Sequence, residues 1–218
     1  MIIHDFEQYS EEWWEARRGR FTASIASKII TPTGKASSQY KSEIGRILAE
    51  QLGMQEPERD FNSEWIQRGT DLEQEARAWF AIETGLDVHE VGFIAHDDQP
   101  FGASPDGVIK IDPFTDRGGN DAFKSIIPCE FKVPKPSTHI RWLLEGGLPA
   151  EHKAQVHFQM ALMDSGHAWF MSYHPELPPL LVKVMRDEFT DALEGFLNDV
   201  ADELESARKI ILGDTDEV

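Results

Sequence analysis

Apolar residues in the N-terminal part of the chain recur three and four positions apart, a spacing that predicts helices. Ser10 and Thr22 precede two such stretches and can cap them, and Gly19 marks a turn between the two. Residues 31–38 predict a loop, and Gly69 is a potential break in the longest stretch. The expected helices cover residues 11–17, 23–30, 39–52 and 62–84.

Beyond Gly85 the pattern changes to short apolar runs of the kind that form strands. The expected strands cover residues 91–95, 101–103, 108–111, 126–133, 168–173 and 180–184, and the expected helices residues 137–145, 150–163 and 188–212. The runs on either side of residues 104–107 read as a hairpin or a bent strand pair, and residues 112–123 as a polar loop. This order predicts one α/β (α+β) domain over residues 1–218, with a helical N-terminal segment and helices flanking a mixed central sheet.

Composition excludes several classes of protein. The chain has one cysteine, Cys129, which rules out a disulfide framework, a Cys-based zinc site and a four-cysteine iron–sulfur cluster. A buried strand position is the simplest role for this residue. No apolar run is long enough to span a membrane, and the acidic start does not resemble a signal peptide. We therefore expect a cytoplasmic protein without a membrane partner.

The net charge of −18 argues at first against a nucleic-acid partner, because DNA binding needs local positive charge. The charges are distributed unevenly, however. Seven basic residues and one acid lie between Arg17 and Arg46, whereas eleven acids and three bases follow from Arg186 onward. A basic surface with an acidic back is compatible with DNA. Acidic composition also serves solubility alone, so charge does not decide the partner.

The candidate chemistry lies beside two predicted strands. Asp106 stands in the turn before one strand, and Glu130 and Lys132 lie within the next. Residues two apart in a strand point to the same face, so Glu130 and Lys132 project together while Phe131 points into the core. Two charged side chains on an apolar strand are costly unless they bind something. Mg²⁺ takes one or two carboxylates together with water and substrate phosphate, so this arrangement suits phosphodiester hydrolysis.

Each of these pieces has an ordinary explanation when taken alone, as a turn or a solvated strand face. Together they form the PD-(D/E)XK pattern. Glu73, one helical turn before Arg77, and the pair Gln155 and Gln159 on one helix face add to it. In isolation these three residues would read as polar positions on the surfaces of amphipathic helices.

In combination the motifs resemble the lambda-exonuclease-like, YqaJ-type viral recombinase family of the PD-(D/E)XK nuclease superfamily. The resemblance extends from about Trp13 through the closing helix and includes an early motif at residues 15–24. It implies a restriction-endonuclease-like core and a 5′→3′ exonuclease that degrades one strand of double-stranded DNA. The products would be 5′-mononucleotides and a 3′ overhang for recombination by strand annealing. A homotrimeric ring, a single-strand annealing protein as partner, and a phage or prophage origin in a bacterial cell are also implied.

The resemblance assigns roles to individual residues. The implied catalytic residues are Glu73, Asp106, Glu130, Lys132 and Gln155. Asp106 and Glu130 would bind metal with the Phe131 carbonyl as a further ligand, and Glu73 would help to hold a second ion. The expected ions are two Mg²⁺ per site, replaceable by Mn²⁺. Lys132 would orient or deprotonate the attacking water.

A second implied site holds the end of the DNA. Arg17, Ser24 and Ser104 would bind the terminal 5′ phosphate. Ser24 begins a predicted helix, and helix N-termini favour anions. Ile66 would be a wedge that separates the terminal base pair, although a helix core position explains it equally well.

Three features depart from the family. The gap between Asp106 and Glu130 is longer, and Gln159 stands where a tyrosine is usual. A second phosphate-binding arginine has no clear equivalent; the candidates are Lys135, His139 and Arg141.

Two other functions compete with an exonuclease. An endonuclease of the same fold would cut covalently closed circles, and the motif around Arg17 and Ser24 argues against it. A non-enzymatic DNA-mimicking or DNA-binding protein would need no Mg²⁺, and the presence of Asp106, Glu130 and Lys132 argues against that alternative.

Overall fold

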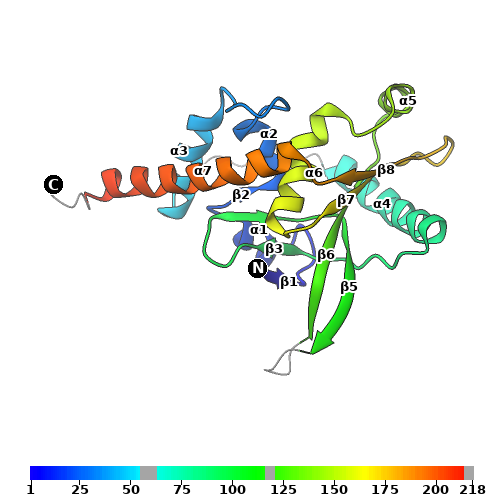
Figure 1. Cartoon of the computed structure of the whole chain (residues 1–218), viewed down its shortest axis with the longest axis horizontal. Helices are drawn as coiled ribbons and strands as arrows, with labels where there is room; N and C mark the ends of the chain where they lie inside the picture. Colours follow the sequence, from blue (N-terminus) through cyan, green and yellow to red (C-terminus); the bar gives the residue numbers. More distant parts are fainter. Residues whose placement is uncertain (55–62, 116–120, 214–218) are drawn as a thin grey trace.

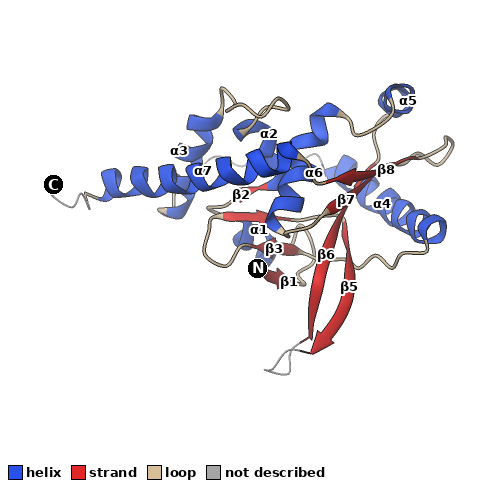
Figure 2. Cartoon of the chain, viewed as in Figure 1, coloured by secondary structure: helices blue, strands red, loops and turns tan. Residues whose placement is uncertain are grey.

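The computed structural model describes residues 1–54, 63–115 and 121–213, with the backbone alone for residues 63–71, 112–115 and 121–124. Within these residues the strands form two four-stranded sheets rather than one central sheet (Figure 2). The first sheet has the order β1 (Ile2–His4), β3 (Phe93–Ala95), β4 (Phe101–Ala103), β2 (Phe21–Thr22). The second has the order β5 (Gly107–Thr115), β6 (Asp121–Lys132), β7 (His167–Ser172), β8 (Leu180–Met185).

Both sheets are mixed. In the first, β1 and β4 run antiparallel to β3, and β2 runs parallel to β4. In the second, β6 and β7 are parallel, and the outer pairs β5–β6 and β7–β8 are antiparallel. A parallel pair needs a long crossover connection, which here contains two helices between β6 and β7. The α+β class expected from the sequence is therefore confirmed.

Helices pack around the sheets except at the β5–β6 hairpin, which projects away from them (Figure 1). They are α1 (Glu11–Arg17), a 3₁₀ turn η1 (Ala23–Ile25), α2 (Ala26–Ile29), α3 (Tyr40–Gln51), α4 (Ser63–Thr84), α5 (Pro136–Glu145), α6 (Ala150–Leu162) and α7 (Glu188–Leu212). Helix α7 packs on α6 and α3 and then extends away from the sheets toward the C-terminus. Among the described residues, no helix is both long and apolar enough to cross a membrane.

The two ends of α7 follow directly from the sequence. Asp187 accepts hydrogen bonds from the Phe189 and Thr190 amides at 3.0 and 3.2 Å, and the Thr190 hydroxyl accepts one from the Asp187 amide, which completes a capping box. Gly213 ends the helix with φ 78°, in the left-handed region that glycine adopts without strain. The predicted bounds of this helix are confirmed.

Two main clusters of apolar side chains hold the layers together. The larger cluster joins the first sheet to α2, α3, α6 and α7 through residues such as Phe101 and Phe158. The smaller cluster packs Ala76 and Phe80 of α4 against Phe131 on β6, with the Phe80 and Phe131 ring centroids 5.6 Å apart. Cys129 is fully buried in this second cluster, as predicted. Because α4 is fixed to β6 in this way, Glu73 is brought beside the strand that carries Glu130.

Several sequence-based expectations are wrong in detail. Strands β1 and β2 were not expected, because three and two residues are too few to show an alternating pattern. The predicted helix over residues 23–30 is split into η1 and the four-residue α2, and the Thr22 hydroxyl does not cap it. Helix α4, in contrast, passes through Gly69 without a break.

The segments around residues 104–107 do not form a hairpin. Strand β4 belongs to the first sheet and β5 to the second, so the chain bends from one sheet into the other between them. Pro105 lies in this bend and has no N–H group with which to continue a ladder. Within residues 112–123, predicted to be a polar loop, the described residues 112–115 and 121–123 instead extend the β5–β6 hairpin as far as the pair Thr115–Asp121. Backbone pairing with the neighbouring strand therefore outweighs the local composition.

Gly102 is a point at which the first sheet tolerates no side chain. A Cβ atom there would lie 2.1 Å from Cζ of Phe93, whose ring is fully buried. Gly102→Ala should therefore lower the free energy of unfolding by about 1–3 kcal/mol, measured by chemical denaturation. The matched control is Gly195→Ala in α7, where an added Cβ meets nothing within 4 Å. This variant should be stabilised by about 1 kcal/mol. Equal stability of Gly102→Ala and the wild type would show that the Phe93 ring moves freely.

Candidate active site

The buried carboxylate of Glu130 is the centre of the site. Its side chain is 1% exposed, in the strand that faces α6. Oε1 accepts hydrogen bonds from the Lys132 ammonium and the Gln155 amide, and Oε2 accepts one from Gln159 Nε2 at 2.6 Å. One ammonium and two amides therefore replace the water that burial removes, which makes a buried negative charge tolerable.

The sequence-based reading of β6 is confirmed in its side-chain directions. Glu130 and Lys132 meet on one face, while Phe131 is fully buried among apolar side chains on the other. Gln155 and Gln159, one turn apart on α6, both reach Glu130. The Oε1 atom of Gln159 is itself buried and has no partner within the described structure.

Asp106 reaches the same place from the bend between β4 and β5. Its Oδ2 accepts a hydrogen bond from the Phe131 amide at 2.7 Å and lies 3.9 Å from the Lys132 ammonium. The bend is fastened from two sides. Arg77 Nη2 donates to the Asp106 carbonyl at 2.9 Å, and Gln8 Nε2 donates to the Pro105 carbonyl at 3.2 Å.

These charges perturb one another strongly. Burial raises the pKa of Asp106 well above its usual range, and the charge of Glu130 adds to this effect while Lys132 opposes it. Burial also raises the pKa of Glu73, with Lys132 opposing and Glu130 adding. Burial lowers the pKa of Lys132, but the carboxylates of Glu130, Asp106 and Glu73 outweigh it, so that this pKa is raised overall. One ammonium thus stands among three carboxylates.

This donor set fits a hard divalent cation. Within the described residues, no three Asp, Glu, His or Cys side chains surround a common point as the ligands of a closed metal cage do. The Lys132 ammonium lies between Glu130 and Asp106 instead. Mg²⁺ does not need a closed cage, because it is usually held by one or two carboxylates together with water and phosphate. The excess of buried negative charge and the purely oxygen donors therefore suit Mg²⁺ rather than zinc.

A second group of polar side chains is built around Arg17. Its Nη1 donates to Ser104 Oγ and its Nη2 to Ser24 Oγ, both at 3.0 Å. The guanidinium lies over the Trp13 ring, 4.1 Å from the centroid, and Trp13 Nε1 also donates to Ser104 Oγ at 2.9 Å. Arg17, Ser24 and Ser104 come from three separate segments, and the fold brings them together.

The surroundings of Arg17 suit an anion. Burial lowers the pKa of Arg17 to about 10, which still leaves it charged at neutral pH. No carboxylate of the described residues forms an ion pair with it; its guanidinium donates to the hydroxyls of Ser104, Ser24 and Thr22. A guanidinium fork without an acidic partner is well suited to bind a phosphate.

Two details of this pocket differ from the sequence-based expectation. Ser24 lies in the three-residue η1 rather than at the start of an α-helix, so a helix dipole does not contribute. Thr22 and Trp13 also belong to the pocket, although the motif reading omitted both. Thr22 Oγ1 lies 3.0 Å from Ser24 Oγ and accepts from Arg17 at 3.4 Å. The sequence does contain one signal for Thr22, because this residue lies two positions before Ser24.

The two groups of residues are joined through one short segment. Ser104 belongs to the Arg17 pocket and Asp106 to the carboxylate cluster, and two residues of chain span at most about 7 Å. The bend at Pro105 therefore fixes the separation between an anion pocket and a potential cation site.

Comparison with known proteins agrees with this geometry. Residues 12–167 match the YqaJ-like viral recombinase domain. The chain belongs to the YqaJ-like viral recombinase family. Similar solved structures include the alkaline exonuclease LHK-Exo from Laribacter hongkongensis, at 29% identity and a TM-score of 0.66 over 94% of this chain and 100% of that one. The same enzyme in complex with dAMP matches at 30% identity and a TM-score of 0.67, with the same coverage.

A more distant match shows the fold alone. It is a phage related exonuclease from Haemophilus somnus 129PT, with 15% identity and a TM-score of 0.56 over 88% of this chain and 96% of that one. Among curated proteins no match to the chain is found.

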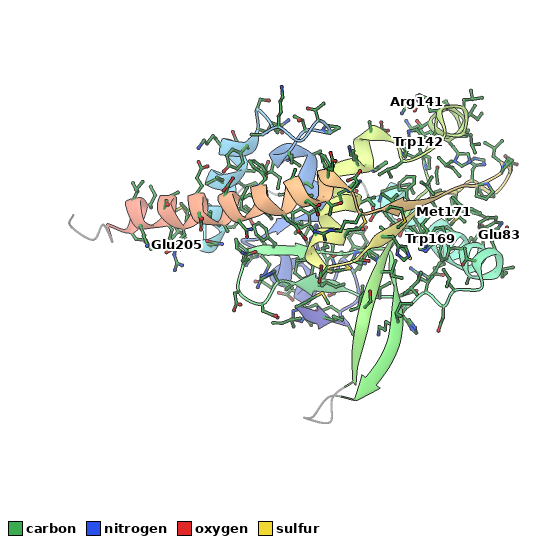
Figure 3. The ribbon with its side chains drawn as sticks, in the orientation of Figure 1. Glu83, Arg141, Trp142, Trp169, Met171 and Glu205 are labelled. Carbon is green, nitrogen blue, oxygen red and sulfur yellow. The ribbon has the colours of Figure 1, made fainter. Side chains whose placement is uncertain are left out.

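In this YqaJ-like chain, the structure reduces the number of candidates for a second phosphate-binding residue. His139 is fully buried, with Nδ1 2.7 Å from Ser172 Oγ and Nε2 3.0 Å from the Pro178 carbonyl, so it is a structural residue and that interpretation is wrong. Arg141 lies on α5 at the periphery (Figure 3), paired with Glu145 and Glu151. Lys135, directly before α5, stays a candidate. The side chain of Ile66 lies outside the described residues, so the wedge stays a prediction.

The expected basic surface between Arg17 and Arg46 is largely neutralised. Its ion pairs join Arg18 to Glu15, Lys28 to Glu43, Lys41 to Glu203, and Arg46 to Glu43 and Glu50. Of these pairs, only Arg18–Glu15 is exposed on both sides, and an exposed pair contributes little stability. Arg17 is distinct from these neighbours because its partners are hydroxyl groups and an aromatic ring.

Gln159 should be needed to keep Glu130 buried. Gln159→Leu removes the donor to Oε2 of this carboxylate and should lower the free energy of unfolding by about 1–3 kcal/mol. The matched control is Gln99→Leu, which removes an exposed amide–amide bond to Asn198 and should change stability by about 0.5 kcal/mol or less. Chemical denaturation of both variants measures the difference. If both lose equally little, Glu130 does not depend on Gln159.

Proposed function

We propose that this protein is a metal-dependent exonuclease that degrades one strand of double-stranded DNA from its 5′ end and leaves a 3′ single-stranded overhang. The observation that supports this proposal most strongly is that residues 104–106 connect the two groups. Ser104 belongs to the Arg17 pocket, and Asp106 belongs to the carboxylate–lysine cluster. A 5′ phosphate bound in the Arg17 pocket would position the next phosphodiester of the same strand at the carboxylate–lysine cluster. Each cut would then release one 5′-mononucleotide. The similarity to an alkaline exonuclease that was crystallised with dAMP supports this reading.

The proposed metal ligands are Asp106, Glu130, the Phe131 carbonyl and, for a second ion, Glu73. The expected ions are Mg²⁺, with Mn²⁺ as a substitute. When bound, they would polarise the scissile phosphate and make water a stronger nucleophile. Lys132, which the neighbouring carboxylates keep charged, would orient the attacking water through its ammonium, and Gln155 would keep the Glu130 carboxylate in place.

The Arg17 pocket would hold the end of the strand between cuts. Its guanidinium fork and the hydroxyls of Ser24 and Ser104 match the three oxygens of a terminal phosphate better than those of a phosphodiester inside a chain. Every cleavage leaves a new 5′ phosphate, so the same pocket would be refilled as the strand advances.

Other properties are proposed on family resemblance alone. They are a homotrimeric ring around DNA, a single-strand annealing protein as partner, and a phage or prophage origin in a bacterial cell.

Linear and closed DNA distinguish this function from its competitors. With Mg²⁺, the wild type should digest linear duplexes and leave covalently closed circles intact, and a chelator should stop digestion. Lys132→Ala should be about 10²–10⁴-fold slower. The control is Lys153→Ala, on the face of α6 that contacts Phe189, which should keep full activity. Cutting of closed circles would favour an endonuclease. DNA binding that needs no Mg²⁺, with no cutting of either DNA, would favour a DNA-binding or DNA-mimicking protein.

The Arg17 pocket predicts a preference for one kind of end. Duplexes with 5′-phosphate ends should be digested much faster than those with 5′-hydroxyl ends, and Arg17→Ala should remove most of this preference. Arg18→Ala is the matched control, because its neighbouring guanidinium is exposed and paired with Glu15. Digestion of both substrates by the three proteins measures the effect. An equal loss on both substrates in Arg17→Ala, reproduced by added salt in the wild type, would reduce Arg17 to a general contact with the DNA backbone.

A further inference from the structure

Tyr9 has a backbone conformation that tyrosine rarely adopts. Its φ is 71°, in the left-handed region favoured by glycine. Hydrogen bonds on both sides hold it there. Gln8 Nε2 donates to the Val91 and Pro105 carbonyls at 3.1 and 3.2 Å, and Ser10 Oγ accepts from the Trp13 amide at 3.2 Å to cap α1. Backbone strain maintained by its surroundings is typical of functional positions.

The Tyr9 ring packs against one of the residues that surround Arg17. Its centroid lies 5.1 Å from that of Trp13, at an interplanar angle of 43°. Trp13 in turn lies under the Arg17 guanidinium and donates to Ser104. Tyr9 is nevertheless 47% exposed. Its hydroxyl forms no hydrogen bond with any of the described residues. Its ring is therefore available to a ligand held in the pocket.

The charges of the carboxylate cluster also act on Tyr9. Burial raises the pKa of its hydroxyl, and the charges of Glu73 and Asp106 add to this effect, while Lys132 and Arg17 lower it. Charges of both groups of residues thus act on one side chain. The Gln8 bond to Pro105 ties the same segment to the bend that joins the two groups.

We infer that the Tyr9 ring is the stacking platform for the 5′-terminal nucleotide, between its terminal phosphate at Arg17 and the scissile phosphate at Asp106 and Glu130. This inference rests on the proposed function. An aromatic ring can stack on any of the four bases, because each has a π-face. A platform of this kind suits an enzyme that must remove every nucleotide in turn. It would fix the sugar and base without reading the sequence.

The test removes the Tyr9 ring and the base that it would contact, separately and together. Substrates are 5′-phosphorylated linear duplexes that carry either a normal or an abasic nucleotide at the 5′ end, and the rate of the first cut is measured. Loss of the stack should slow the wild type on the abasic end by on the order of ten- to a hundredfold. On the normal end, Tyr9→Ala should be slower than the wild type by a similar factor. On the abasic end, Tyr9→Ala should be no slower than it is on the normal end. Tyr9→Phe, which keeps the ring, should resemble the wild type on both.

Two controls separate stacking from a structural effect. Trp14→Ala removes another exposed ring that contacts Trp13 and should keep the full difference between the two ends. Tyr9→Asn tolerates the left-handed conformation and should behave like Tyr9→Ala if the ring matters. If the losses from Tyr9→Ala and from the abasic end multiply, Tyr9 does not contact the base and the inference is overturned. If the wild type does not digest linear duplex at all, the proposed function itself fails.

Discussion

The burial of one negative charge organises this molecule. Glu130 is almost inaccessible to water, and its carboxylate is tolerated because an ammonium and two amides are directed at its oxygens. These donors come from β6, which carries Lys132, and from α6, which carries both amides, so the carboxylate joins the two elements. Helix α6 also packs against the first sheet and α7 through the larger apolar cluster, which includes Ala154 and Phe158.

The bend at residues 104–107 has the second controlling role. It carries the chain from one sheet to the other and is fastened by Arg77 and Gln8, two residues from distant parts of the sequence. Ser104 and Asp106 lie on either side of Pro105, so an anion pocket and a carboxylate cluster share one rigid support. The chemistry of each group would be of little use without this fixed relation to the other.

Local patterns predicted those parts of the site that one element determines. The period of two placed Glu130 and Lys132 together, and the spacing of four placed Gln155 and Gln159 together. Contacts between segments that are distant in the sequence could not be predicted, because no local pattern of residues indicates them. Strands β1 and β2 are too short to show a pattern, and Lys41 pairs with Glu203, far along the chain. The Arg17 pocket needed the family resemblance, because its three polar residues come from separate segments.

The long β5–β6 hairpin has a consequence for how such sites diverge. Gly107 is paired with Cys129, so the residues that follow Asp106 and precede Glu130 are cross-strand neighbours. The separation of the two carboxylates is therefore set by the register of the first pair in the ladder, and residues added at the far end leave it unchanged. The number of residues between the two halves of the motif is free to drift during evolution. A search that requires a constant interval would miss members of the family, whereas one that requires a strand pair in this register would retain them.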